Sequence, residues 1–230
     1  MRQTIDAAAF QQMVIHAAAA IRAEKQRIND LNVFPVPDGD TGTNMSLSIG
    51  AAAAEMKKQS FDTVGKAAQA TASALLRGAR GNSGVILSLL FRGFAKAVKD
   101  KDSIDGRDLA IALDFGVAAA YKAVMKPAEG TILTVSRLAA ARAAGAARED
   151  NCFEAVLEAA IQEGQLALAD TVNQNPVLKK AGVVDAGGAG FLLILQGMLN
   201  EVRGEEMPAD EEPAQAEKAD FGAIPAEDIT

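Results

Sequence analysis

Apolar residues recur every three or four positions along most of the chain, which is the spacing of one face of an α-helix. The first stripe runs from Phe10 to Leu31 and follows Asp6, a residue type that often caps a helix start. Alternation of apolar and polar residues, which is typical of a half-buried strand, is rare. Seven further stripes lie within residues 45–56, 64–76, 85–98, 109–124, 132–139, 153–168 and 191–202. The pattern predicts an all-α protein of eight amphipathic helices in a bundle or closed ring, with no central helix.

Composition allows one domain with a sizeable core, or at most two small domains. The chain has 230 residues, of which 49% are hydrophobic and 23% charged, and this excludes disorder throughout. A single cysteine, Cys152, excludes an internal disulfide, and a single histidine, His16, excludes a zinc site built from Cys and His. We expect both to be structural, so any metal must be held by oxygen.

Charge is distributed unevenly along the chain. Residues 201–230 hold 10 of the 30 acidic residues and only two of the 23 basic ones, so the body is nearly neutral. A neutral body with one Tyr and no Trp argues against nucleic-acid binding. We predict a folded domain over residues 1–203 and an acidic linker over 204–230. Neither a membrane-spanning run nor a signal-peptide pattern is found, which predicts a cytoplasmic protein.

A candidate metal site lies between the first two helices, in the segment LNVFPVPDGDTGTNM, residues 31–45. Asp38 and Asp40 stand two apart among glycines, and such a loop can wrap a hard cation such as Mg²⁺ or Ca²⁺. An EF-hand alignment from Asp38 fails at Gly42, Thr43 and Ile49. Hydroxyls and amides of residues 41–44 follow where the next helix begins, and helix starts attract anions. By itself the segment also fits an ordinary turn.

Three further loops have a similar form. RGARGNSGV, residues 77–85, places Asn82 and Ser83 at a helix start, although it lacks the ending of a P-loop and also fits a well-capped turn. MKPAEGTILT, residues 125–134, offers Thr131 as a cap and Lys126 as a phosphate or partner contact. KAGVVDAGGAGF, residues 180–191, surrounds Asp185 with glycines before an apolar helix. If the four loops converge at one end of a bundle, they form a cup for nucleotide phosphates.

Together the segments LNVFPVPDGDTGTNM, GARGNSGVILS, KPAEGTILTV and NPVLKKAGVVDAGGAG closely resemble the N-terminal, ATP-binding domain of the bacterial fatty acid kinases. That family is related to the L subunit of dihydroxyacetone kinase. The resemblance covers about residues 4–203 and rests on four motifs in the same order. It implies an antiparallel eight-helix barrel whose nucleotide sits at one end, with two Mg²⁺ ions bridging phosphates and protein carboxylates.

The resemblance also implies roles for individual residues. Asp38 and Asp40 would bind the metals and act in catalysis, with Asn32 as a further oxygen ligand. The dihydroxyacetone branch has a third aspartate shortly before this pair, which the present sequence lacks. Nucleotide contacts would come from Thr41, Gly42, Thr43, Asn44, Gly81, Asn82, Ser83, Thr131, Arg137, Asp185, Ala186 and Gly187.

The reaction implied by the family is transfer of the ATP γ-phosphoryl to a fatty acid carboxylate, which gives an acyl phosphate and ADP. A separate fatty-acid-binding carrier protein and the remaining domains of the same kinase would be its partners, and a homodimer is compatible with the Ala-rich helices. The chain by itself is expected to bind nucleotide without phosphorylating carrier-bound fatty acid. Two alternatives remain open: a dihydroxyacetone-type phosphotransferase subunit whose ADP does not exchange, and a non-catalytic helical module.

Overall fold

The structure is a computed structural model that describes residues 1–209, so part of the predicted acidic linker, residues 210–230, lies outside the described range. The described residues form helices and connecting loops, and their only β-type pairing is an isolated bridge between Ile5 and Ile104. No helix in this range has the length and apolar character needed to cross a bilayer. The helices are α1 (Ala7–Ala23), α2 (Lys25–Asp30), α3 (Thr41–Lys58), α4 (Val64–Gly78), α5 (Gly81–Ala97), α6 (Gly106–Ala123), α7 (Ile132–Glu149), α8 (Phe153–Gln174), α9 (Pro176–Ala181) and α10 (Ala186–Val202).

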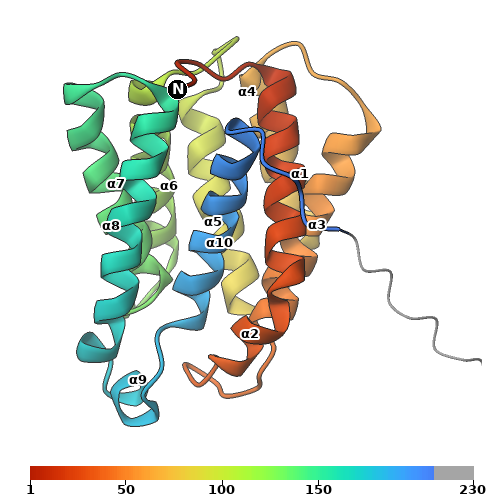
Figure 1. Ribbon diagram of the computed structural model, residues 1–230. Helices are drawn as coiled ribbons and strands as arrows, with labels where there is room; N and C mark the ends of the chain where they lie inside the picture. The colour runs from red at the N-terminus through yellow and green to blue at the C-terminus, as the bar shows by residue number, and fades with distance from the viewer. Residues whose placement is uncertain (210–230) are drawn as a thin grey trace, which may run out of the picture.

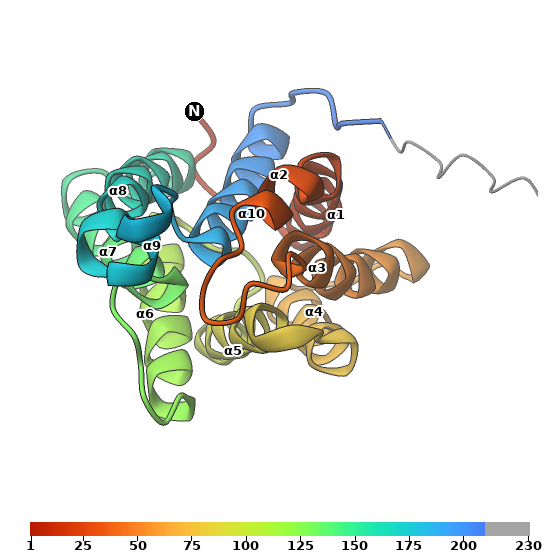
Figure 2. The ribbon, with the colours of Figure 1, turned by 90° about the horizontal axis from the view of Figure 1, so that it is seen from below.

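Eight of these helices form a closed ring. Each packs against the next in the order α1, α3, α4, α5, α6, α7, α8 and α10, and α10 closes the ring against α1. Figure 2 shows this ring from one end, where the short helices α2 and α9 lie. The predicted all-α barrel is confirmed.

Successive long helices run up and down, and this alternation decides where the loops lie. Helices α3, α5, α7 and α10 all begin at the end that carries α2 and α9, which is the lower end in Figure 1. The four glycine-bearing loops precede these same four helices. They therefore meet at one end of the barrel.

Two short helices, α2 and α9, were not predicted as separate elements. The long first helix is interrupted at Glu24, which separates α1 from α2. Next to this break, the backbone of Lys25 lies against Gly42 of α3, a tertiary contact that apolar periodicity does not encode. The six-residue α9 was not among the predicted helices because it offers too few apolar positions for a stripe, although Asn175 caps it and Pro176 begins it.

The most enclosed helix of the ring is α10. Thirteen of its 17 residues are buried, and it packs against α3 and α7 as well as against its ring neighbours α1 and α8. Its glycines permit this enclosure, because a Cβ on Gly197 would lie 2.9 Å from the Cα of Ala17 in α1. The small residues of α1 and α10 therefore let the two backbones approach closely.

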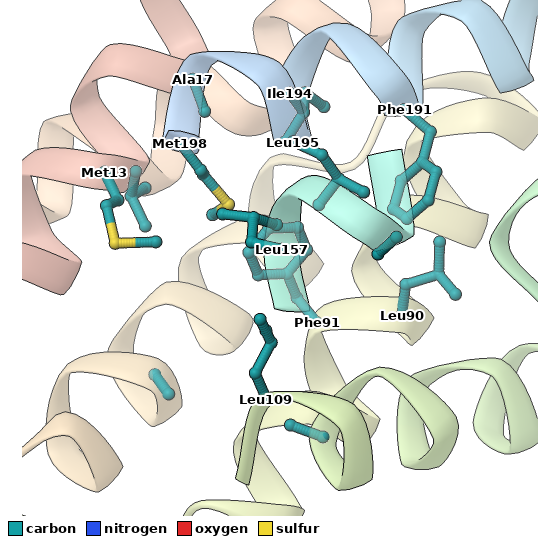
Figure 3. Close-up of a cluster of buried hydrophobic side chains, with 14 of the residues drawn as sticks. Met13, Ala17, Leu90, Phe91, Leu109, Leu157, Phe191, Ile194, Leu195 and Met198 are labelled. Carbon is teal, nitrogen blue, oxygen red and sulfur yellow. The ribbon is translucent and has the colours of Figure 1, made fainter. Parts of the chain in front are cut away.

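The interior of the barrel is apolar. Figure 3 shows Phe91, Leu109, Leu157, Leu195 and Met198, from α5, α6, α8 and α10, gathered in this core. The cavity among these core side chains measures only about 40 Å³, close to the share of one water molecule in the liquid. The barrel centre is therefore packed in this structure, and the roomier cleft lies at its end.

The two residues that were expected to be structural lie in the walls of the barrel. His16 is fully buried in α1, with its Nδ1 2.9 Å from Oε2 of Glu201 on α10. Cys152 is also fully buried, and its thiol donates to the carbonyl of Arg2 over 3.3 Å.

Candidate functional site

A cleft of about 550 Å³ opens at the end of the barrel where the four loops meet. This volume lies within the range of about 300–1,000 Å³ that is usual for small-molecule sites. Most of the residues singled out in the sequence line it: Asn32, Asp38, Asp40, Thr41, Asn44, Gly81, Asn82, Ser83, Thr131, Asp185 and Gly187. The structure thus brings together residues that are up to 155 positions apart in the chain.

Two carboxylates on one side of the cleft are free. Asp38 is exposed in the loop before α3, and Asp40 is the half-buried residue at which α3 begins. Asp40 makes no side-chain cap bond to its helix. Within residues 1–209, neither carboxylate has a hydrogen-bond or ion-pair partner. Their oxygens are available to a hard cation, which prefers such ligands.

Asn32 holds this loop in shape. Its amide oxygen accepts from the backbone N–H groups of Asp40 (3.1 Å) and Thr41 (3.2 Å), and its Nδ2 donates to the carbonyl of Val36 (2.9 Å). An amide oxygen has two lone pairs, and both are engaged here. In this structure Asn32 therefore orients the loop, and its predicted role as a metal ligand stays a prediction.

The protein provides few other ligand groups for a metal. Among residues 1–209, no three side chains of His, Cys, Asp or Glu come together as a metal cluster. Magnesium commonly binds with one or two protein carboxylates and completes its six ligands with water and phosphate oxygens. The free aspartates Asp38 and Asp40 beside an open cleft fit this mode of magnesium coordination.

The first turn of α3 is occupied from inside the protein. Asn29 accepts from the backbone N–H of Thr43 and donates to its hydroxyl, both over 3.0 Å. Gly42 is buried against the backbone of Lys25. Thr43 and Gly42 were predicted to contact nucleotide, and the structure places both outside the cleft lining.

The first turn of α5 is open by contrast. Arg80, at the position before the helix, makes no side-chain cap bond, so the first N–H groups of α5 lack the capping partner that Asn29 and Asn32 give to α3. Gly81 has a φ of +60° and lies so close to Asn44 that a Cβ there would meet its Nδ2 at 2.5 Å. Ser48 joins the two helices, since its hydroxyl accepts from the N–H of Arg80 and donates to the carbonyl of Asn44. The open start of α5 is thus fixed against the α3 side of the cleft.

The starts of α7 and α10 have side-chain caps. Thr131 accepts from the N–H of Leu133, and Asp185 accepts from the N–H of Gly188 over 2.7 Å. Burial raises the pKa of Asp185 to about 6, although its backbone N–H donors oppose the shift. Asp185 therefore differs from Asp38 and Asp40: it is a buried cap that reaches the cleft.

Two predicted nucleotide contacts lie elsewhere. Ala186 is buried in a small cluster with Ile28 and Ala189, and it does not line the cleft. Arg137 is not among the lining residues of the cleft, and its guanidinium pairs with Glu129 (2.9 Å) and donates to the hydroxyl of Tyr121 (3.1 Å). The structure therefore does not bring these two residues to the site.

Several residues that shape the cleft were not singled out. An apolar wall is formed by Phe34, Pro35, Val36, Val85, Ile86, Val124, Ile132 and Leu133. The signal for part of this wall was present, since Val85, Ile86 and Ile132 stand one to three residues after predicted helix starts. The roles of Asn29 and Ser48 carried no local signal, because Thr43 is 14 residues from Asn29 and Arg80 is 32 residues from Ser48.

A solved structure with the same architecture identifies the class of fold. The crystal structure of the dihydroxyacetone kinase from C. freundii in complex with AMP-PNP and Mg²⁺ superposes with a TM-score of 0.65 at 19% sequence identity. The match covers 87% of this chain and 35% of that chain. The fold is therefore the all-α barrel found within that kinase.

Sequence similarity then gives the family. The DAK2 domain matches residues 35–200, and the chain belongs to the DAK2 domain family. It is 46% identical over 206 residues to protein YloV of Bacillus subtilis. The aligned region covers 90% of this chain and 37% of YloV. An uncharacterized protein of Staphylococcus haemolyticus is 43% identical to this chain. That alignment covers the whole of this chain and 43% of the length of the relative. The chain thus spans less than half the length of these relatives.

Proposed function

We propose that this domain binds Mg-ATP in the cleft and supplies the γ-phosphoryl group to the carboxylate of a fatty acid. The products are an acyl phosphate and ADP. The fatty acid arrives on a separate carrier protein, and further domains of the same kinase complete the site. The observation that carries the proposal is the cleft itself, which joins two free carboxylates to an uncapped helix start.

The residues present fit a magnesium–phosphate ligand. Asp38 and Asp40 would hold two Mg²⁺ ions, which when bound neutralise phosphate charge and align the phosphates. The first N–H groups of α5 and the side chains of Asn82 and Ser83 would receive phosphate oxygens, since helix starts favour anions. The solved relative contains AMP-PNP and Mg²⁺, which supports the same pairing of ligands here.

The apolar wall fits the base of a nucleotide. Val85, Ile86, Val124 and Leu133 line the same cleft as the carboxylates and offer surface for stacking and burial of an aromatic ring. Asp185 and Gly187, at the start of α10, also line the cleft and would close it over the nucleotide.

The acceptor chemistry needs no general base from this chain. A fatty acid carboxylate is already ionised at pH 7, so no proton is removed as its oxygen bonds to the γ-phosphorus and the bond to the ADP oxygen breaks. Neither His16 nor Cys152 lines the cleft. The apolar cavity inside the barrel, at about 40 Å³, is too small for an acyl chain, which supports delivery by a carrier.

Calorimetry tests the nucleotide part of the proposal. Titration with ATP and with ADP should show binding that depends on Mg²⁺, and both nucleotides should exchange freely. Absence of binding with and without Mg²⁺ would support a non-catalytic helical module. Bound ADP that does not exchange would support a dihydroxyacetone-type phosphotransferase subunit.

The acceptor is tested separately. Mg-ATP is supplied with either a carrier loaded with fatty acid or dihydroxyacetone, to the chain alone and to a longer protein that contains it. We expect acyl phosphate only from the longer protein with the loaded carrier. Robust acyl phosphate formation by the chain alone, or phosphorylation of dihydroxyacetone, would contradict the proposal.

A further inference from the structure

The segment between α6 and α7 supplies one wall of the cleft, through Val124, Lys126, Ala128 and Thr131. Lys126 is exposed and is the only basic side chain among the residues that line the cleft in the described part of the chain. The other charged lining residues are Asp38, Asp40 and Asp185, so the cleft without ligand is acidic. The ammonium group of Lys126 is therefore a candidate contact for an anionic ligand in this cleft.

The acid nearest to Lys126 in its own loop is engaged with other groups. Glu129 accepts from the hydroxyl of Thr134 (2.7 Å), from Nη2 of Arg137 (2.9 Å) and from the hydroxyl of Tyr121 (3.2 Å). The hydroxyl of Thr134 and the guanidinium of Arg137 hold the pKa of Glu129 below its usual value, so this carboxylate stays ionised and paired. Glu129 therefore does not neutralise Lys126.

This network also fixes the loop between two helices. Tyr121 lies in the last turn of α6, whereas Thr134 and Arg137 lie in the first two turns of α7. Their shared partner Glu129 ties the intervening segment to both. Across residues 1–209, Lys126 itself has no ion pair or hydrogen bond within the chain. Its ammonium group is available while its backbone is held at the cleft.

We propose that Lys126 binds the polyphosphate of a nucleotide in this cleft, and that the network of Tyr121, Glu129, Thr134 and Arg137 keeps Lys126 unpaired. The inference rests on the proposed nucleotide site and adds a specific protein cation to it. A triphosphate carries several negative charges, and a lysine ammonium is a common point-charge ligand for phosphate. Arg137 is then a positioning residue that acts through Glu129, without a contact of its own to the nucleotide.

The first experiment compares Lys126→Met with Lys122→Met. Lys122 is an exposed lysine four residues earlier that does not line the cleft, so it controls for net charge. In calorimetry with Mg-ATP, we expect Lys126→Met to weaken binding by about 10-fold, as for loss of one charge-assisted hydrogen bond. Lys122→Met should change it less than two-fold, and Lys126→Arg should retain most of the affinity. The salt dependence of binding should also be shallower in Lys126→Met than in the control.

These outcomes separate the two proposals. If the unaltered protein binds no nucleotide, the proposed function fails. If it binds Mg-ATP and Lys126→Met binds as tightly as Lys122→Met, the assignment of Lys126 is wrong while the nucleotide site stands. Circular dichroism should show unchanged helicity in every variant, because both lysines are exposed.

The second experiment tests the network by rescue. Arg137→Met should release the Glu129 carboxylate to pair with Lys126 and weaken Mg-ATP binding several-fold. Adding Glu129→Gln in that background should restore most of the affinity, because the competing charge is removed while hydrogen bonds to the loop remain. If Glu129→Gln does not restore the Mg-ATP affinity that Arg137→Met loses, Arg137 contacts the nucleotide directly and its positioning role is wrong.

Discussion

The starts of α3 and α5 look alike in sequence and differ in the folded protein. Each follows a glycine-bearing loop, and each faces the same cleft. At α3, Asn29 and Asn32 occupy the first N–H groups from inside, and the carboxylates of Asp38 and Asp40 stay free. At α5, the N–H groups have no side-chain cap and no carboxylate stands nearby in the loop.

The difference divides the proposed site into a carboxylate side, which suits cations, and an open-amide side, which suits anions. A helix start whose amides are already capped has little left to offer a phosphate, whereas free carboxylates attract metal ions. An uncapped helix start, whose N–H groups are open, instead favours anions such as phosphate. The contact between Gly81 and Asn44 places the two sides next to each other, as a magnesium–phosphate ligand requires.

The largest expected effect comes from removing the cation side. Asp38→Asn and Asp40→Asn should each abolish Mg²⁺-dependent nucleotide binding, a loss of more than about 100-fold in calorimetry, because each removes a carboxylate ligand. Helicity should stay intact, since neither side chain has a partner within residues 1–209. Asp100→Asn, at an exposed position outside the cleft, is the matched control. Unchanged affinity in either cleft variant would remove the metal assignment.

A smaller effect should appear at Asp185, the buried carboxylate that shares the cleft with the two free ones. Its pKa of about 6 lies above 3.8, the usual value for an aspartate, so the folded protein binds this proton more tightly than the unfolded chain. Its contribution to stability is present below about pH 4, is lost as the pH rises to about 6 and is constant above that. Two pKa units correspond to roughly 3 kcal/mol at most.

Urea unfolding of the protein and of Asp185→Asn at pH values from 4 to 7 measures this contribution. Asn retains an oxygen for the cap and does not titrate. The free energy of unfolding of the unaltered protein, relative to that of Asp185→Asn, should therefore fall as the pH rises from about 4 to 6. A difference that does not vary with pH would show that Asp185 titrates as a solvated aspartate.

The smallest expected effect comes from replacing one glycine near the start of each of the two helices, α3 and α5. Gly39 and Gly81 have similar positive φ values, +66° and +60°, but a Cβ would enter open space at Gly39 and meet Asn44 at Gly81. Gly39→Ala should therefore cost about 1 kcal/mol of unfolding free energy, and Gly81→Ala about 1 kcal/mol more. Only Gly81→Ala should also weaken nucleotide binding, because it separates the two sides of the cleft. Equal effects of the two changes in thermal unfolding and in binding would contradict the close junction.

Much of the fold could be predicted because its governing signals are local. Stripes of apolar residues gave the eight long helices, and caps such as Asp6 and Thr131 were visible at their starts. The short α9 and the break at Glu24 were missed, since neither changes the spacing of apolar residues enough to be seen.

The cleft was predictable in its position and less so in its detail. Antiparallel helices bring every second helix start to the same end, so four loops with one type of sequence must converge. Which groups then face the cleft depends on contacts between distant residues. Thr43 is engaged by Asn29 and Arg137 by Glu129, and neither pairing has a signal in the sequence around it.

The sequence by itself determined the class of fold, the end of the barrel at which polar loops gather, and the chemistry that these loops carry, because periodicity and residue type are properties of short segments. Only the tertiary structure decided which carboxylates are free, which helix start is uncapped and which lysine lines the cleft. The reason is physical: a hydrogen-bonding group has a limited number of partners, and the folded chain chooses them from residues far away in sequence.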